Sequence, residues 1–305
     1  MESLKNIYNK LLSQEKSIHK ATDSERQMIQ DIEIEMLDDL VKVCDKYGLT
    51  LLLGGGSCLG AVRHGGFIPW DEDMDFNMPR DDFEILKKIF ESELGEKYIL
   101  HAPNSNERKA KWRFGRVEKK GTLLLDNTIR EQCNGICIDI FPIEKIPKNI
   151  IRRYLHGILI EGVMFAAGQV WFAKESNEIF RTAMKRSNKM RYYSKLIVGN
   201  LLSIRSLDKW YDIVDHCCQF KGDTHLMGVP TGRKHYFGEI FDSSVYLPKK
   251  ETSFNGHKAY LPNKDDLYLS NLYGDYMRIP PEDKREHHYL YGLEIDGRRV
   301  EPIRH

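Results

Sequence analysis

Three consecutive glycines between a short apolar run and a serine constrain the fold of this chain more than any other feature. Residues 49–53, LTLLL, predict a buried strand, and residues 54–56 are the glycines that turn the chain. Ser57 follows directly and begins a predicted helix that Gly65 ends. Because the N–H groups of such a turn and helix start suit a phosphate, the segment predicts a phosphate-binding strand–turn–helix unit.

Two aspartates follow this unit at close spacing. Asp73 and Asp75 stand two residues apart on a strand predicted at residues 71–78. Side chains at this spacing leave the same face of a strand, and Asp71 shares that face. Paired carboxylates provide the oxygen ligands that a hard divalent cation prefers. An exposed acidic strand end has the same pattern, so both interpretations stay open at this point.

A third acid interrupts an apolar strand predicted at residues 136–141, ICIDIF. A buried carboxylate without a partner is costly. Asp139 is therefore expected either to act as a catalytic group or to form a salt bridge with a buried arginine. Together with the glycine turn and the aspartate pair, it favours phosphoryl-transfer chemistry on a nucleotide-like substrate.

The wider sequence predicts an α/β fold of the α+β type, with a mixed sheet core, flanking helices and a helical insertion. We expect an N-terminal helical segment (1–47), a catalytic core (48–147), the helical insertion (148–220) and a C-terminal part that completes the active-site cleft (221–305). Ser24 and Gln27 fit a capping box in the first segment. Further helices are predicted at residues 80–91, 263–273 and 280–289, and further strands at residues 112–118 and 122–126.

Net charge indicates which kinds of partner the protein binds, and cysteine content indicates the cellular compartment. The chain has 46 basic and 45 acidic residues, a net charge of +1, which argues against nucleic acid as a partner. Its six cysteines form no CxxC pair, and the charged N-terminal sequence does not resemble a secretory signal. We therefore expect a cytoplasmic protein with reduced thiols.

Two segments raise the question of membrane contact. Residues 154–173 are mostly apolar but include His156 and Glu161. Since an ionisable residue within lipid is costly, a buried helix is preferred to a spanning one. The run at residues 185–195, KRSNKMRYYSK, places five basic residues beside two tyrosines. A solvated helix face explains this run, and contact with an anionic inner membrane surface or a charged polymer is the alternative.

Residues 53–75 resemble the signature of the LicD family within the nucleotidyltransferase superfamily. The similarity depends above all on the run RHGGFIPWDEDMD at residues 63–75. It extends over residues 45–290 and includes LYGDYM at residues 272–277, followed by two prolines. Bacterial members of this family transfer phosphocholine from CDP-choline to surface glycans, and relatives include ribitol-phosphate transferases. The resemblance implies a nucleotidyltransferase-like sheet for the catalytic core.

The resemblance also implies roles for the three acids. Asp73 and Asp75 are expected to bind Mg²⁺ or Mn²⁺, with Asp139 as the third catalytic and metal-binding carboxylate. The metal would neutralise the diphosphate and stabilise the departing CMP oxygen. Asp139 could also accept or orient the proton of the attacking hydroxyl.

The residues expected to contact substrate surround these acids. They are Gly55, Gly56, Ser57, Arg63, His64, Trp70 and Arg116. Arg63 and His64 lie between the glycine turn and the aspartates, where they could meet diphosphate oxygens, although Arg63 could equally brace the acidic strand. Trp70 could contact a quaternary ammonium or belong to the core. Arg116 could neutralise phosphate or face solvent.

The expected activity is metal-dependent transfer of phosphocholine from CDP-choline to a hydroxyl of a teichoic-acid, capsular or lipopolysaccharide precursor, with release of CMP. The glycan acceptor could be lipid-linked, which would agree with peripheral membrane contact. Transfer of ribitol- or glycerol-phosphate from a CDP-alditol is one alternative. A small-molecule nucleotidyltransferase is another, although the GGFIPW segment at residues 65–70 argues against it.

Overall fold

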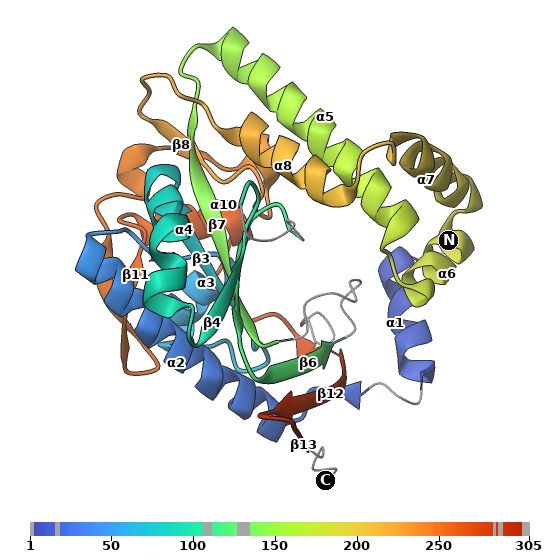
Figure 1. The fold of residues 1–305 in the computed structure, drawn as a ribbon, viewed down its shortest axis with the longest axis horizontal. Coiled ribbons are helices and arrows are strands. Elements are labelled where there is room, and N and C mark those ends of the chain that lie inside the picture. The colour runs from blue at the N-terminus through green and yellow to red at the C-terminus, as the bar shows by residue number, and fades with distance from the viewer. Residues whose placement is uncertain are drawn as a thin grey trace.

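The computed structural model describes residues 3–15, 19–105, 112–126, 135–282, 285 and 289–300. These residues form a mixed α/β architecture, as the sequence predicts, with a central sheet between helices (Figure 1). Cys133 lies outside the described residues, and the cysteines within them are free thiols.

A mixed sheet at the centre positions the acidic residues. Its strand order is β2-β3-β7-β5-β4, and β8 and β9 extend it from the C-terminal end of β7. The strands are β2 (Leu52–Leu53), β3 (Met74–Pro79), β4 (Tyr98–His101), β5 (Gly115–Lys119), β7 (Cys137–Ile146), β8 (Leu226–Gly228) and β9 (Ile240–Asp242). β3 and β7 run parallel, whereas the other described pairs of this sheet are antiparallel. Asp75 is paired with Asp139 in the β3–β7 register, so the sheet brings these two acids side by side.

The alternation of side chains along β3 explains which face of the strand packs on the core. Met74, Phe76 and Met78 are buried in the main core, while Asp75 between them faces the other side. The strand begins at Met74, three residues later than expected. Asp71 and Asp73 therefore lie on the segment that leads into β3.

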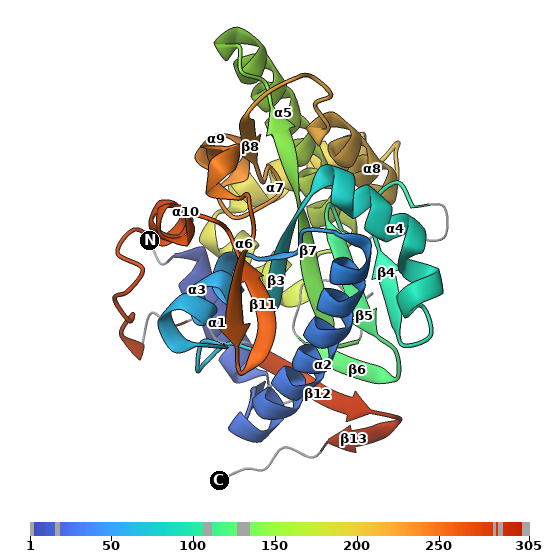
Figure 2. The same cartoon turned by 90° about the vertical axis from the view of Figure 1, so that its left-hand side faces the viewer.

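Helices pack around this sheet. α4 (Arg80–Leu94) packs against β3, β4 and β7, with α2 (Asp23–Tyr47) beside it. α3 (Gly55–His64) lies against β3, and α10 (Asp265–Tyr273) lies against α3. Figure 2 shows α2 and α4 on one side of β3, and α3 and α10 on the other.

The sequence predicts a helical segment at residues 1–47, but the described residues of this segment form two helices with a short strand between them. They are α1 (Leu4–Gln14), β1 (His19–Lys20) and α2. The capping box of α2 is formed by Thr22 and Glu25, so the expected box at Ser24 and Gln27 is wrong. The carboxylate of Glu25 also lies 2.9 Å from the His19 ring, which favours this helix start over the later one.

The middle of the chain is helical, as expected. It contains α5 (Ile150–Lys174), α6 (Glu178–Ser187), α7 (Lys189–Leu202) and α8 (Leu207–Cys218). Ile160, Met164 and Val214 belong to a second apolar core between these helices. Within the described residues, α5 is the one helix long and apolar enough to span a membrane, and 39% of its most apolar stretch is buried. The expectation of a buried helix is therefore only partly met. The division of the chain into four parts stays a prediction.

The C-terminal part combines short strands and helices. It contains α9 (His235–Gly238), a 3₁₀ helix (Ser243–Val245), β10 (Lys250–Phe254), β11 (His257–Leu261), α10, β12 (Tyr289–Ile295) and β13 (Arg298–Val300). β12 pairs with β1, β13 and β6 (Thr122–Asp126). Half of the helix expected at residues 280–289 lies outside the described residues. Of those described, Pro280 and Pro281 have no regular structure and Tyr289 begins β12, so the expected bounds are wrong.

Candidate active site

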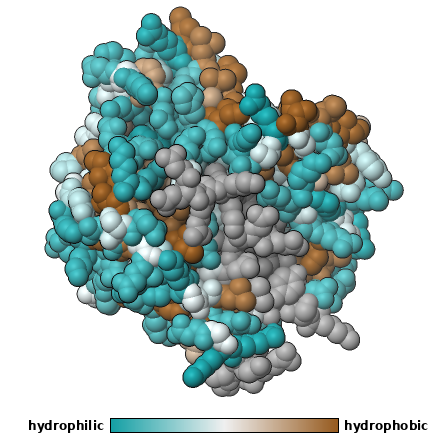
Figure 3. Space-filling view, viewed as in Figure 1, coloured by the Kyte–Doolittle hydropathy of each residue, from teal (hydrophilic) through white to brown (hydrophobic). Residues whose placement is uncertain are grey.

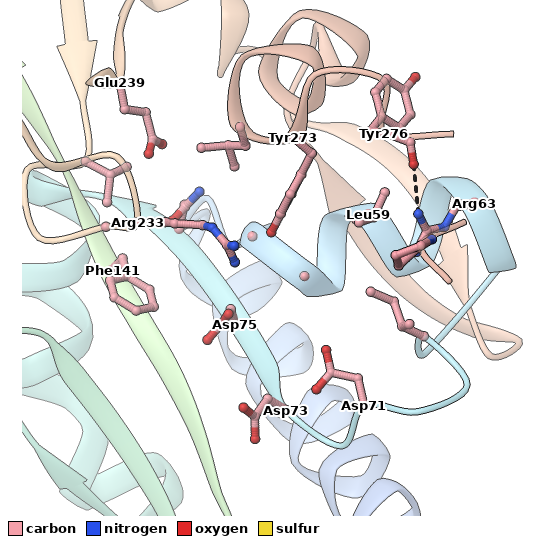
Figure 4. Close-up of a pocket in the computed structure, with 18 of the residues that line it drawn as sticks. Leu59, Arg63, Asp71, Asp73, Asp75, Phe141, Arg233, Glu239, Tyr273 and Tyr276 are labelled. Atoms are coloured by element: carbon pink, nitrogen blue, oxygen red, sulfur yellow. Dashed lines mark hydrogen bonds between the residues drawn. The ribbon is translucent and has the colours of Figure 1, made fainter. Parts of the chain in front are cut away.

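A cavity of about 610 Å³ lies where the start of α3 meets the start of β3 (Figure 4). Distant segments of the chain contribute to its wall. Of the expected site residues, those that line it are Gly55, Gly56, Arg63, Trp70, Asp73 and Asp75. Within the described lining, Ser57, His64, Arg116 and Asp139 are absent. The structure therefore brings the glycine turn and the aspartate pair together in one cavity, whereas the other four residues lie outside its described lining.

Glycine is favoured at position 55, in the first turn of α3, because a carboxylate approaches it closely. A Cβ at Gly55 would lie 3.1 Å from Oδ2 of Asp75, whereas one at Gly56 would make an ordinary contact with Oδ2 of Asp71 at 3.4 Å. Gly55 also has a φ of +43°, which side-chain-bearing residues rarely adopt. The N–H of Gly55 donates to the Tyr268 hydroxyl at 3.0 Å. A phosphate would therefore be bound through the amides of Gly56 and the next residue rather than through that of Gly55.

Ser57 connects the helix start to the acidic segment. Its hydroxyl accepts a 2.8 Å hydrogen bond from the N–H of Asp75 and is 3.4 Å from the carbonyl oxygen of Asp73. The serine is 3% exposed. Its side chain thus holds the aspartates against α3, which differs from the phosphate contact expected from the sequence.

Asp71, Asp73 and Asp75 border the same cavity. Figure 4 shows their carboxylates beneath the start of α3, with Arg233 and Tyr273 above Asp75. Burial raises the pKa of Asp75 well above its ordinary value, and the negative charges of Asp139, Asp73 and Asp71 raise it further. The site therefore concentrates negative charge that a bound cation would relieve.

Glu33 is an acid that sequence reasoning missed. It lies on the buried face of α2 and is 2% exposed, and its Oε2 has no hydrogen-bond partner among the described atoms. Burial raises its pKa well above the ordinary value, and Asp73 and Asp71 are the next largest causes. An acid among the apolar positions Ile29, Met36 and Leu40 was the available signal.

Asp139 forms the salt bridge that the sequence left as an alternative. Its two oxygens accept from Nε and Nη2 of Arg116 at 2.5 and 2.6 Å. The two residues face each other across β5 and β7, and the Arg116 guanidinium lies 4.6 Å from the Trp112 ring centroid. Arg116 is thus engaged by protein groups in this structure, where the sequence suggested phosphate or solvent.

Arg63 and Trp70 border the cavity, and His64 follows Arg63 outside the described lining. Arg63 donates to the carbonyl oxygen of Tyr276 at 2.8 Å and to Nε2 of His64 at 2.9 Å. Burial, together with the neighbouring Arg63, lowers the pKa of His64. Trp70 packs against the core, and the Arg285 guanidinium lies 4.3 Å from its ring centroid. Arg63 and Trp70 therefore both contact the protein and border the cavity, but Arg63 bonds the backbone at Tyr276 and not the acidic strand. Their contact with substrate stays a prediction.

Several lining residues come from segments that carried no recognisable motif. They are Asn77, Arg113, Arg233, Glu239, Arg278 and Arg285, while Asp275 lines the cavity from the LYGDYM segment. Glu239 is 2% exposed, and burial raises its pKa to about 8, although a hydrogen bond from the Tyr246 hydroxyl acts in the opposite direction. The described residues contain no ready-formed cluster of three or more His, Cys, Asp or Glu ligands for a metal ion.

Strands β2 to β7, the glycine turn and the acidic segment lie in the part of the chain that resembles a nucleotidyltransferase domain. Residues 48–157 match the family model described as LicD/FKTN/FKRP, nucleotidyltransferase domain, which confirms the resemblance to the LicD family. The chain is 25% identical over 281 residues to the lipopolysaccharide cholinephosphotransferase LicD of Haemophilus influenzae, a match that covers 89% of this chain and 97% of that relative. The ribitol 5-phosphate transferase FKRP of Mus musculus and that of Homo sapiens are each 39% identical over 56 residues, 18% of this chain and 11% of theirs.

Proposed function

We propose that the protein transfers phosphocholine from CDP-choline to a hydroxyl of a cell-surface glycan precursor and releases CMP. That it is an enzyme of the phosphotransferase type follows from its LicD-type domain and its relatives. The donor and acceptor are proposed from the similarity to a lipopolysaccharide cholinephosphotransferase along nearly its whole length. The observation that carries the proposal is the meeting of Asp71, Asp73 and Asp75 with the first turn of α3 in one cavity.

A divalent cation, Mg²⁺ or Mn²⁺, is proposed to bind at Asp73 and Asp75, with Asp139 as third carboxylate. The donors are all oxygens, which such cations prefer, and the crowding of acids that raises the pKa of Asp75 favours a cation there. When bound, the ion would neutralise diphosphate charge and stabilise the leaving oxygen. Arg116 donates to both oxygens of Asp139, so direct coordination by Asp139 would use the lone pairs that Arg116 leaves open or would follow a movement of Arg116.

The chain's own groups would hold the donor for attack. The amides of Gly56 and Ser57 would bind phosphate oxygens at the helix start, and Arg63 and Arg233 would add positive charge. The acceptor hydroxyl would attack the phosphorus that bears choline, and the bond from that phosphorus to the CMP oxygen would break. The hydroxyl proton would pass to a carboxylate of the site.

Aromatic rings at the cavity support choline as the cargo. Trp70 and Tyr273 line the cavity, and each has a guanidinium against its ring, that of Arg285 and that of Arg233 respectively. Rings that attract a guanidinium also suit a quaternary ammonium, which would take the place of one arginine.

A CDP-alditol donor is the second candidate. The match to ribitol 5-phosphate transferases covers 56 residues at 39% identity. Asn77 and Glu239 also give the cavity hydrogen-bonding groups that an alditol would use. A donor comparison separates the two candidates, because the aromatic contacts favour choline and these polar groups favour ribitol or glycerol.

The test is CMP release from CDP-choline by purified protein with Mg²⁺ and a lipopolysaccharide or teichoic-acid preparation, with label in the choline methyl groups. We expect label on the glycan, loss of CMP release with EDTA, and loss in Asp73→Ala and Asp75→Ala. Asp81→Asn is the matched control, because its carboxylate is 79% exposed and its salt bridge within the described residues is to Lys145. Turnover of CDP-ribitol but not CDP-choline would reassign the cargo, and turnover of neither would reject the proposal.

A further inference from the structure

One face of α5 exposes apolar side chains to solvent. Their spacing of one and then three residues keeps them on a single side of the helix. They are Ile150, Ile151, Tyr154, Leu155, Ile158 and Leu159, each between 53% and 67% exposed. The opposite side of α5 is packed into the protein, as Ile160 and Met164 are buried. α5 is therefore apolar on two sides. One stripe packs against the protein, and the other is exposed to solvent.

α7 repeats this arrangement beside α5. Its exposed apolar residues follow one another at intervals of three or four, which again places them on one face. They are Met190, Tyr193, Ile197 and Leu201, continued by Ile204, and all are at least 49% exposed. Gly199 packs α7 closely against the backbone of Gln169 in α5. Figure 3 shows apolar side chains along the upper outer edge of the molecule, over both helices.

Basic residues are frequent in and next to the exposed parts of both helices. Residues 145–160 and 185–205 contain ten basic residues and no acidic residue. The rest of the chain has 36 basic and 45 acidic residues, so positive charge is concentrated beside the exposed apolar faces. Arg152, Lys185 and Lys189 are among the exposed basic residues. Exposed apolar patches of this extent mark interaction surfaces.

We propose that the exposed apolar residues of α5 and α7, with the exposed basic residues beside them (Arg152 on α5, Lys185 in the last turn of α6 and Lys189 on α7), bind the surface of an anionic lipid bilayer; we call this set the α5–α7 surface. Apolar side chains would enter the boundary of the hydrocarbon, and the basic residues would meet anionic headgroups. The helix lies on the bilayer and does not cross it, because its inner stripe is packed on the protein and Glu161 accepts a hydrogen bond from the N–H of Tyr236.

Charge complementarity favours lipid over a second copy of the chain. A twofold contact would place the same basic residues of both copies against each other. A nucleic acid or an acidic polysaccharide would satisfy the charges but would leave the apolar stripes in water. Anionic lipid is the partner that satisfies both features.

The test is co-sedimentation of the full chain with sucrose-loaded vesicles of phosphatidylglycerol and phosphatidylcholine, and with vesicles of phosphatidylcholine alone. We expect binding to the anionic vesicles that weakens at about 0.5 M NaCl and is at least roughly tenfold weaker on phosphatidylcholine. Leu155→Ser/Ile158→Ser and Lys185→Glu/Lys189→Glu should each lower binding by roughly tenfold or more. Ile85→Ser on α4, an exposed apolar residue elsewhere, is the control and should bind as the wild type does.

Thermal unfolding checks that the variants stay folded, which we expect because the changed side chains are exposed. Absence of binding to anionic vesicles overturns the inference. Binding by both double variants that equals that of the wild type also overturns it. A concentration-dependent dimer in light scattering that the Leu155→Ser/Ile158→Ser variant abolishes would also overturn it, since a second copy would then cover the surface. The experiment measures vesicle binding and not CMP release. A negative result would therefore reject the membrane contact without testing the proposed transfer reaction.

Discussion

Disruption of the Arg116–Asp139 pair should produce a measurable coupling in stability. Both hydrogen bonds are short, and the side chains are only 18% and 15% exposed. Exposed ion pairs contribute about 0–1 kcal/mol, whereas loss of one partner of a buried pair costs about 3–5 kcal/mol. We therefore expect Asp139→Asn to lower the free energy of unfolding by about 2 kcal/mol. Arg116→Met should cost about 3 kcal/mol, because it also removes the contact with the Trp112 ring.

The assay is urea unfolding of the wild type, both single variants and the double variant. We expect the double variant to be about 2 kcal/mol more stable than the sum of the single effects predicts. The pair of Lys145 and Asp81 is the matched control, since its side chains are 41% and 79% exposed, and its coupling should stay below about 0.5 kcal/mol. Additive effects of Arg116 and Asp139 would refute the reasoning and would mean that Asp139 is free to bind a ligand in solution.

Three further predictions follow from the site. Gly55→Ala should fold but release CMP at least about tenfold more slowly, because its Cβ meets Asp75 at 3.1 Å and its φ is positive; unchanged turnover contradicts this. Ser57→Ala should lower the free energy of unfolding by about 1–2 kcal/mol, since the N–H of Asp75 loses its acceptor. In this variant kcat should fall more than the KM for CDP-choline rises, and the reverse would favour phosphate contact. The pKa of Glu239 is raised to about 8, so its folded form binds a proton more tightly than the unfolded chain does. Stability from this group is present below pH 4.5 and is lost as pH rises towards 8, and Glu239→Gln should flatten that decline in denaturation curves.

The parts of the site that are local in sequence could be predicted. The glycines, Ser57 and the aspartates at residues 71–75 form one short segment, so their chemistry is readable without the fold. The in-register pairing of Asp75 with Asp139 depends on β3 and β7 being parallel neighbours. Asp75 and Asp139 could each be recognised in the sequence, but their position side by side could be known only from the order and direction of the strands.

Other features could not be read from the sequence because tertiary contacts decide them. Arg233 and Glu239 reach the cavity from a turn-rich region without periodicity. Thr22 and Ser24 each head a pattern that fits a capping box, and the contact of His19 with Glu25 favours the earlier one. The helix expected at residues 280–289 does not include its last residue, since Tyr289 begins β12, which pairs with three other strands.

The most direct test of the account is Mn²⁺ binding measured by electron paramagnetic resonance in the presence of CDP-choline. The account predicts that wild-type protein and Asp81→Asn remove free Mn²⁺ from solution, and that Asp73→Asn and Asp75→Asn, still folded, do so at least about tenfold less tightly. Equal Mn²⁺ affinity in all four proteins would contradict a cation-bound diphosphate at the start of α3.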